Sequence, residues 1–326
     1  MSMQIKLWGV RGSLPSPMMP SEIEGRVREC ITEFLRRGNK SPDQVDEFLR
    51  SLAPEKWGGY GGNTACIQVS TPKETVLIDG GSGLRRAGEA LSDGPLGRGQ
   101  GEAHLFFTHF HWDHLIGLPF FTPLFIPGNQ IHFYAVQDDL EQAIRTLFKK
   151  PYFPVPFERL GAELFFHKLE PRTPRRLGTL SLTPYRLDHP DPCWGYKIQS
   201  ENKTFSYCVD TECTRSSAAD LGADLPLYQG VDLMVFDAQY TILDAAERVN
   251  WGHAAAAFGL DIAMREGIKR VYFVHHDPAA SDARIAEAET QARDYYLSQV
   301  QTSKSTGRKL HEVEWSFAQE GALLKL

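Results

Sequence analysis

The pattern of hydrophobic and polar positions predicts a chain of short strands and amphipathic helices. Apolar runs bounded by turn residues predict strands at 4–10, 64–69, 75–78, 130–136, 180–187, 194–199, 204–209, 231–236 and 270–274. Helical spacing of apolar residues predicts helices at 138–149, 254–265 and 283–297. The early strands follow one another like hairpins and the later ones alternate with helices, so we expect mixed sheets covered by helices.

Residues 16–57 look like an insertion made of two helices, which we call the helical hairpin. The first begins at a predicted capping box, Ser21 to Glu24, and ends at Gly38; its apolar stripe is Ile23, Val27, Ile31, Phe34 and Leu35. The second begins at another capping box, Ser41 to Gln44, and its stripe is Val45, Phe48, Leu49 and Leu52. We interpret the hairpin as packing against the body of the protein. A lid over the active site and a contact between two copies are the alternatives.

Composition narrows the classes of function. Of the 326 residues, 42% are hydrophobic and 23% are charged, which is typical of a globular protein with a full core. The formal net charge of −6 argues against binding long nucleic acid, because phosphate neutralisation needs a basic surface. The start of the chain lacks the features of a signal peptide, and no apolar run approaches the ~20 residues of a membrane span. We therefore expect a cytoplasmic protein without a membrane segment.

The five cysteines are odd in number and include no C-x-x-C pair. They fit neither a disulfide framework nor a zinc knuckle. Free thiols in a reducing compartment are the expected state; the cysteines are Cys30, Cys66, Cys193, Cys208 and Cys213.

The richest chemistry lies in the segment 108–114, which reads His-x-His-x-Asp-His after an apolar run. Imidazole and carboxylate suit a borderline metal such as Zn²⁺. Alternate side chains of extended backbone point the same way, so His109 and His111 are placed to bind one ion. Asp113 and His114 lie on the following turn and are placed to bind a second. The segment therefore predicts a metal site.

Further residues of ligand type stand where predicted strands emerge into loops. They are His189, Asp210, and either His275 or His276. Each also fits as a capping aspartate or a surface histidine. Asp79 follows another strand and begins a glycine run, but that run completes neither a Walker motif nor a dinucleotide fingerprint. We expect Asp79 to accept backbone N–H groups beneath the metal loops.

Taken together, these segments resemble the metallo-β-lactamase-fold hydrolase superfamily. The resemblance rests on 7–13, 62–64, 79–81, the His-x-His-x-Asp-His motif, His189, Asp210 and His275. It covers nearly the whole chain apart from the helical hairpin. It implies one α/β domain over 1–326, a four-layer αββα sandwich of two mixed sheets with the hairpin inserted and a dinuclear metal centre at one edge.

The resemblance also implies the ligand set. The first metal would be held by His109, His111 and His189; the second by Asp113, His114 and His275; Asp210 would bridge the two. We prefer His275 to His276 because it follows the strand directly. Two Zn²⁺ ions per chain suit these nitrogen and oxygen donors, with Mn²⁺ or Fe²⁺ as alternatives.

Within the superfamily, the chain resembles the phosphodiesterase branch, which includes ribonuclease Z and small cyclic-nucleotide phosphodiesterases. True β-lactamases usually carry cysteine at the position of Asp210. The ribonuclease Z pattern of an acidic residue and a Gly-His pair matches Asp237 and His253, so His253 is expected to assist at the phosphate. Asp237 is one methylene shorter than the usual glutamate, which leaves its reach to His253 open. Asp113, Asp237 and His253 are the expected catalytic groups.

The expected reaction is hydrolysis of a small phosphodiester, with a 3′,5′-cyclic nucleotide as the best guess, by attack of a metal-bridging hydroxide. The densest basic cluster, 172–176, holds three arginines, too few to grip an RNA fold. Asn63, Tyr152 and Phe153 are the candidate substrate-binding residues, and Trp57 and Tyr60 are further candidates for stacking on a base. The alternatives are a ribonuclease Z-like endonuclease acting at the 3′ end of transfer RNA and a non-hydrolytic module that binds nucleotide or metal.

Overall fold

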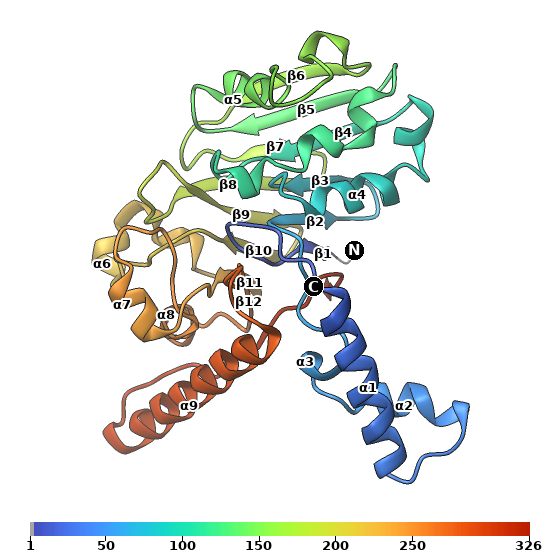
Figure 1. The fold of residues 1–326 in the computed structure, drawn as a ribbon. Helices are drawn as coiled ribbons and strands as arrows, with labels where there is room; N and C mark the ends of the chain where they lie inside the picture. The colour runs from blue at the N-terminus through green and yellow to red at the C-terminus, as the bar shows by residue number, and fades with distance from the viewer. Residues whose placement is uncertain (1–2) are drawn as a thin grey trace.

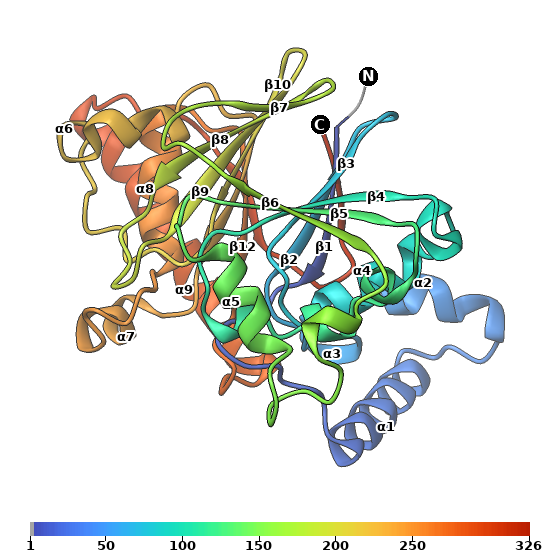
Figure 2. The ribbon, with the colours of Figure 1, turned by 90° about the horizontal axis from the view of Figure 1, so that it is seen from above.

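Two seven-stranded sheets pack face to face, and helices cover their outer faces, in the computed structural model, which describes residues 3–326 (Figures 1 and 2). The strand order is β14-β1-β2-β3-β4-β5-β6 in the first sheet and β13-β12-β11-β10-β9-β8-β7 in the second. The first sheet comprises β1 (Gln4–Gly9), β2 (Cys66–Ser70), β3 (Thr75–Ile78), β4 (Glu102–Phe106), β5 (Gln130–Ala135), β6 (Glu163–Lys168) and β14 (Leu323–Lys325). The second comprises β7 (Arg175–Leu177), β8 (Leu180–Arg186), β9 (Trp194–Ser200), β10 (Lys203–Cys208), β11 (Leu233–Asp237), β12 (Arg270–Val274) and β13 (Glu314–Phe317).

Each sheet is half antiparallel and half parallel. The strands from β14 to β3 pair antiparallel, and those from β3 to β6 pair parallel. The second sheet repeats this arrangement, antiparallel from β7 to β10 and parallel from β10 to β13. The expectation of mixed sheets is therefore confirmed. Among the early strands, the expected antiparallel succession holds for β1 to β3, whereas β3 to β6 are parallel and need crossover connections.

Three apolar cores separate the four layers. The central core lies between the sheets and includes Ile5, Val69 and Phe205. Leu84 of α4 (Gly83–Leu91) and Ile144 of α5 (Leu140–Leu147) pack on the outer face of the first sheet. The outer face of the second is covered by α8 (Ala256–Glu266) and α9 (Asp282–Thr306), with α6 (Ala218–Leu221) and α7 (Ile242–Glu247) in its loops. The predicted αββα sandwich is confirmed.

The structure also corrects element boundaries. The helix expected at 283–297 continues to Thr306 and ends at Gly307, whose φ of +71° suits a helix terminus. The pattern did not predict β6, β7, β13 and β14. These strands are short or lie at sheet edges, where one side remains in water and the apolar signal is weak.

The helical hairpin comprises α1 (Pro20–Arg36), α2 (Val45–Arg50) and α3 (Pro54–Trp57), and α1 and α2 project from the sandwich (Figure 1). The capping box predicted at Ser21 is wrong. Pro20 occupies the first turn, and the Glu22 carboxylate accepts the Met19 backbone N–H at 2.7 Å, so the helix begins earlier. The second capping box forms as predicted, with the Gln44 side chain accepting the Ser41 N–H at 3.1 Å.

Packing of the hairpin is one-sided. The rings of Phe34 and Phe48 meet edge to face at 5.2 Å, and Arg26 forms an ion pair with Asp282 at the start of α9. Phe34 is the one residue of the α1 stripe in these contacts. The other four are 49–62% exposed, namely Ile23, Val27, Ile31 and Leu35. The hairpin therefore contacts the body through Arg26, but these four stripe residues do not pack on it.

Two further predictions concerned the cysteines and membrane-spanning segments. All five cysteines are free, as predicted, and only Cys30 is not fully buried. Across residues 3–326, no helix combines the length and the apolar character that a membrane crossing needs.

Candidate metal centre

The predicted ligands meet where strands of both sheets end. Three residues at these ends hold a left-handed backbone: Asp79 after β3 (φ 63°), Asp210 after β10 (φ 63°) and His275 after β12 (φ 65°). Such conformations are uncommon for residues other than glycine and cluster at functional sites. In each case the turn directs a side chain of ligand type toward the junction of the two sheets.

One cluster contains His109, His111 and His189. Their ligand atoms lie within 4.8 Å of one another, and the ring centroids of His109 and His111 are 4.4 Å apart. The His189 ring lies 4.8 Å from each of them. His111 and His189 reach the cluster from loops of different sheets, so the site forms only when the sandwich closes.

A second cluster contains Asp113, His114 and His275. The Asp113 Oδ2 atom lies 3.2 Å from His275 Nε2 and 3.4 Å from His114 Nε2. It also accepts the Ser13 backbone N–H at 2.8 Å, which anchors the carboxylate to the loop after β1. His276 does not take part, because its Nε2 donates to the Ala318 carbonyl at 3.0 Å.

Asp210 lies between the clusters. Its Oδ2 is 2.5 Å from His114 Nε2 and 3.6 Å from His109 Nε2, while its Oδ1 is 3.2 Å from His275 Nε2. Despite these close contacts, four buried atoms here make no hydrogen bond of acceptable geometry: Nε2 of His109, His114 and His189, and Oδ2 of Asp210. Buried polar atoms without partners are costly, and a pair of divalent cations would satisfy all four. The residues therefore fit a dinuclear centre.

Outer contacts orient the ligand side chains. The buried Asp79 carboxylate accepts the Thr108 backbone N–H at 2.9 Å, as predicted, and also lies 2.9 Å from His114 Nδ1. Sequence reasoning missed Asp191, whose carboxylate lies 2.8 Å from His111 Nε2 and whose carbonyl lies 3.0 Å from His189 Nδ1. Such partners fix the tautomer and the orientation of a ligating ring.

Burial and charge set the protonation of the ligands. Burial lowers the pKa of His109 well below its usual value and so favours the neutral ring that a metal needs. Burial would also raise the pKa of Asp210, but His275, His114 and His109 hold it well below the ordinary range. The carboxylate between the clusters is therefore ionised.

Asp237 and His253 stand beside the clusters. His253 Nδ1 lies 3.1 Å from Asp237 Oδ2 and 3.1 Å from Asp210 Oδ1, so the shorter aspartate does reach the histidine. Burial would lower the pKa of His253, but the two carboxylates outweigh it and raise the pKa to about 10. Nδ1 is committed to these carboxylates, which leaves Nε2 as the atom available for other chemistry.

Gly252 supports the first cluster. Its φ is +90°, and a Cβ at this position would lie 2.3 Å from His189 Cδ2. Its N–H donates to Glu212 at 2.9 Å. The glycine before His253 therefore lets the chain pass directly under the His189 ring.

The predicted substrate-binding residues differ in their exposure and in their contacts with the rest of the protein. The Asn63 amide is engaged, donating to Glu320 at 2.6 Å and accepting from the Ser82 hydroxyl at 2.9 Å. Tyr152 is 69% exposed, whereas the Phe153 ring packs edge-on against Phe148 at 5.6 Å. Contact of these three with substrate stays a prediction. The prediction that Tyr60 stacks on a base is wrong, because its ring is buried and cannot reach a substrate.

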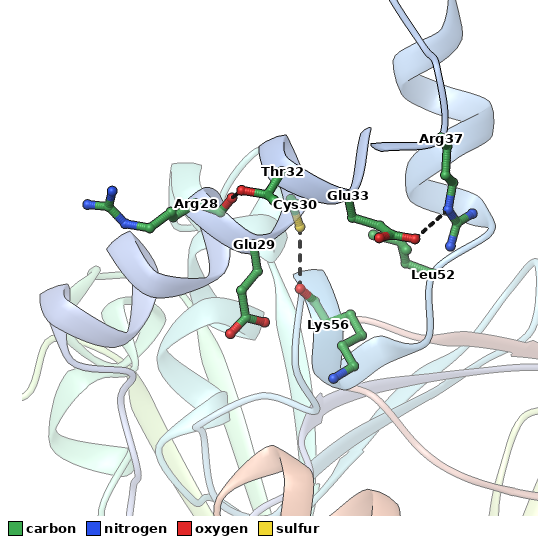
Figure 3. A pocket seen from close by; sticks show the side chains of 8 residues that line it. All are labelled: Arg28, Glu29, Cys30, Thr32, Glu33, Arg37, Leu52 and Lys56. Carbon is green, nitrogen blue, oxygen red and sulfur yellow. Dashed lines mark hydrogen bonds and ion pairs between the residues drawn. The ribbon is translucent and has the colours of Figure 1, made fainter. Parts of the chain in front are cut away.

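A separate cavity lies within the helical hairpin. It has a volume of about 450 Å³, and Cys30, Glu33, Leu52 and Lys56 are among the residues that line it (Figure 3). None of the candidate metal ligands contributes to it. The cavity is therefore distinct from the metal centre.

Comparison with known proteins agrees with this geometry. Residues 74–276 match the family described as the beta-lactamase superfamily domain, and this span includes the metal motif and His275. The chain belongs to the beta-lactamase superfamily. The matched span contains every residue of the two ligand clusters and Asp210.

Relatives and solved structures extend the comparison. Ribonuclease BN of Escherichia coli O7:K1 is 22% identical over 266 residues, covering 64% of this chain and 80% of that protein. Yeast PDE1 in its unliganded form superposes with a TM-score of 0.60 at 14% identity, over 99% of both chains. The short form of human tRNase Z gives a TM-score of 0.58 at 15% identity, over 98% of both chains. The metallo-beta-lactamase fold protein YhfI of Bacillus subtilis gives a TM-score of 0.60 at 14% identity, over 100% of this chain and 99% of that one, and this likeness shows the fold.

Proposed function

We propose that this superfamily member is a metal-dependent phosphodiesterase that hydrolyses a small phosphodiester, best represented by a 3′,5′-cyclic nucleotide. The observation that carries the proposal is the placement of His253. This histidine is held at 3.1 Å by Asp237 and stands beside the carboxylate that lies between the two ligand clusters. A cationic histidine at that position suits a reaction in which an anionic ester loses an alkoxide.

The ligand clusters would hold two divalent cations, with Zn²⁺ the first choice. When bound, such a pair lowers the pKa of water and neutralises phosphoryl oxygens. His109, His111 and His189 would hold one cation, Asp113, His114 and His275 the other, and Asp210 would contact both. His253 would use Nε2 to donate a proton to the departing oxygen while Asp237 fixes its Nδ1 side.

The surface charge supports a small substrate. The chain carries a formal net charge of −6. Within the basic cluster, Arg172 is bound to Asp224 at 2.9 Å, and Arg175 lies over the Tyr134 ring with 5.5 Å to its centroid. All three arginines of this cluster are exposed, and the charge of Arg172 is offset by Asp224. The other two arginines are too few to hold the phosphates of an RNA body.

The second candidate is an endonuclease acting on transfer RNA. It is favoured by the similarity to ribonuclease BN, which extends over 80% of that protein. The two functions share the metal chemistry and differ in how much of the substrate is held. They are therefore separated by substrate comparison and not by metal content.

The deciding experiment is a comparison of kcat/KM under one metal loading. The substrates are cyclic AMP, cyclic GMP and precursor transfer RNA. A thioester is included as a substrate that is not a phosphodiester. We expect a cyclic nucleotide to have the highest kcat/KM, with the His253→Ala variant as the background control. Cleavage of the RNA at one defined 3′ position, with a higher kcat/KM than either cyclic nucleotide, would replace the first candidate with the second.

We propose further that a second copy of the chain covers the exposed stripe of α1. The stripe is continuous at four-residue spacing, and charges of both signs flank it, such as the ion pair of Glu24 and Arg28 at 2.8 Å. The hairpin is nearly neutral, with eight acidic and seven basic residues between Glu22 and Lys56. A near-neutral surface carrying both charges suits a self-complementary, twofold contact.

A further inference from the structure

A second group of histidines lies on the first sheet, away from the metal centre. His104 on β4 is paired in register with His132 on β5, and Glu102 begins β4 on the same face. The ring centroids of the two histidines are 5.1 Å apart, with their planes 27° from parallel. The group of Glu102, His104 and His132 shares no residue with the ligand clusters of the dinuclear centre. It is therefore a separate cluster.

The Nε2 atoms of both histidines converge on one carboxylate oxygen. Glu102 Oε1 lies 3.2 Å from His104 Nε2 and 3.1 Å from His132 Nε2. Two ligand atoms bound at about 2.0 Å to one tetrahedral cation are separated by about 3.3 Å. The two distances from the Glu102 oxygen are thus close to those of a formed site, and the ligand atoms of all three residues lie within 4.8 Å of one another.

The opposite ring nitrogens have polar partners that can orient the rings. His104 Nδ1 lies 3.0 Å from the Tyr134 hydroxyl, and His132 Nδ1 lies 2.9 Å from His167 Nε2. In the tautomer in which each Nδ1–H donates to its partner, each Nε2 presents a lone pair on the side of the Glu102 carboxylate. His132 Nε2 is buried and has no hydrogen-bond partner. A cation between these atoms would be bound by both lone pairs and by the carboxylate.

We propose that Glu102, His104 and His132 form a third metal site, which binds a divalent cation of the Zn²⁺ class. Two imidazoles and one carboxylate are an established donor set for Zn²⁺. Tyr134 and His167 serve as the outer partners that orient ligating rings. Burial and the nearby Arg175 lower the pKa of both His104 and His132, so each ring is neutral at physiological pH. Glu102 is 53% exposed, which gives the cation access from solvent.

The test is zinc uptake by the protein already loaded with its active-site metals. Titration with Zn²⁺ in a calorimeter is expected to show one further equivalent per chain. Glu102→Gln, which keeps the shape of the side chain but removes its charge, should weaken this step at least tenfold. His311→Gln, a change at an exposed histidine outside the group, should leave it unchanged.

A second readout identifies the ligands directly. Cu²⁺ added in place of Zn²⁺ should give an electron paramagnetic resonance spectrum with coupling to two imidazole nitrogens, and His132→Gln should reduce it to one. Circular dichroism and retained active-site metals establish that each variant is folded. Uptake of no further Zn²⁺ by the parent, or equal uptake by Glu102→Gln, would overturn the proposal. The number of zinc equivalents bound and the number of coupled nitrogens do not depend on the reaction catalysed. The proposed phosphodiesterase function is therefore tested separately.

Discussion

Replacement of Gly252 by alanine tests whether the loop before His253 positions the metal centre. The new Cβ would lie 2.3 Å from His189 Cδ2, whereas carbon atoms rest at about 3.5 Å or more. The ring must therefore move by about 1.2 Å, and metal–ligand distances tolerate only about 0.2 Å. We expect the affinity of the first metal to fall at least 10–100-fold, the range found when the orientation of a ligand is lost.

Gly38→Ala is the matched control. Gly38 also has a positive φ, +79°, but a Cβ there would meet nothing within 4 Å. Both variants carry the backbone cost of roughly 1–2 kcal/mol for a left-handed L-residue. Only Gly252→Ala adds the collision with His189. The assay is metal content and competition with a chelator, together with thermal unfolding. If Gly252→Ala holds both metals as tightly as Gly38→Ala does, the reasoning about this contact is refuted.

Three further changes test other parts of the molecule. Asp113→Ala should reduce metal content from about two ions per chain to about one, because this carboxylate belongs only to the second cluster; retention of both ions would contradict that assignment. His253→Ala should keep its metals while kcat falls roughly 10²–10⁴-fold, the usual loss for a general acid; loss of metal would make His253 a ligand instead. Ile31→Glu on α1 should shift the chain from dimer to monomer in analytical ultracentrifugation, whereas Leu297→Glu, at a similarly exposed position of α9, should not.

The sequence predicted what is local in the chain. The ligands from His109 to His114 are contiguous, and strand periodicity placed His189, Asp210 and His275 at strand ends. The alternation of strands and helices predicted mixed sheets covered by helices, and the resemblance to the superfamily implied the four-layer order. These features depend on short segments whose pattern is visible without knowledge of the rest of the fold.

Contacts between distant segments could not be predicted. Asp191 lies 80 positions from the ring of His111, and an aspartate two residues after a histidine carries no distinctive pattern. Asp282 joins three segments, since it pairs with Arg11 and Arg26 and accepts the Tyr60 backbone N–H. The apolar stripe of α1 is a further feature whose contacts the sequence could not predict. Its periodicity established an apolar face but not what that face contacts, because periodicity is the same for an inner core and an outer surface.

The left-handed turns at Asp79, Asp210 and His275 have a consequence for folding itself. Each holds its backbone in a conformation that costs of the order of 1 kcal/mol or more, and the ligand atoms between them are desolvated. A ligand that binds only the folded chain stabilises it by RT ln(1 + [L]/Kd), and ions held by residues from both sheets would approach that condition. Supply of the divalent metal would then govern the lifetime of the chain as well as its rate of turnover. A shortage of the metal would increase loss of the protein by proteolysis, because the unfolded fraction would rise as the ions leave.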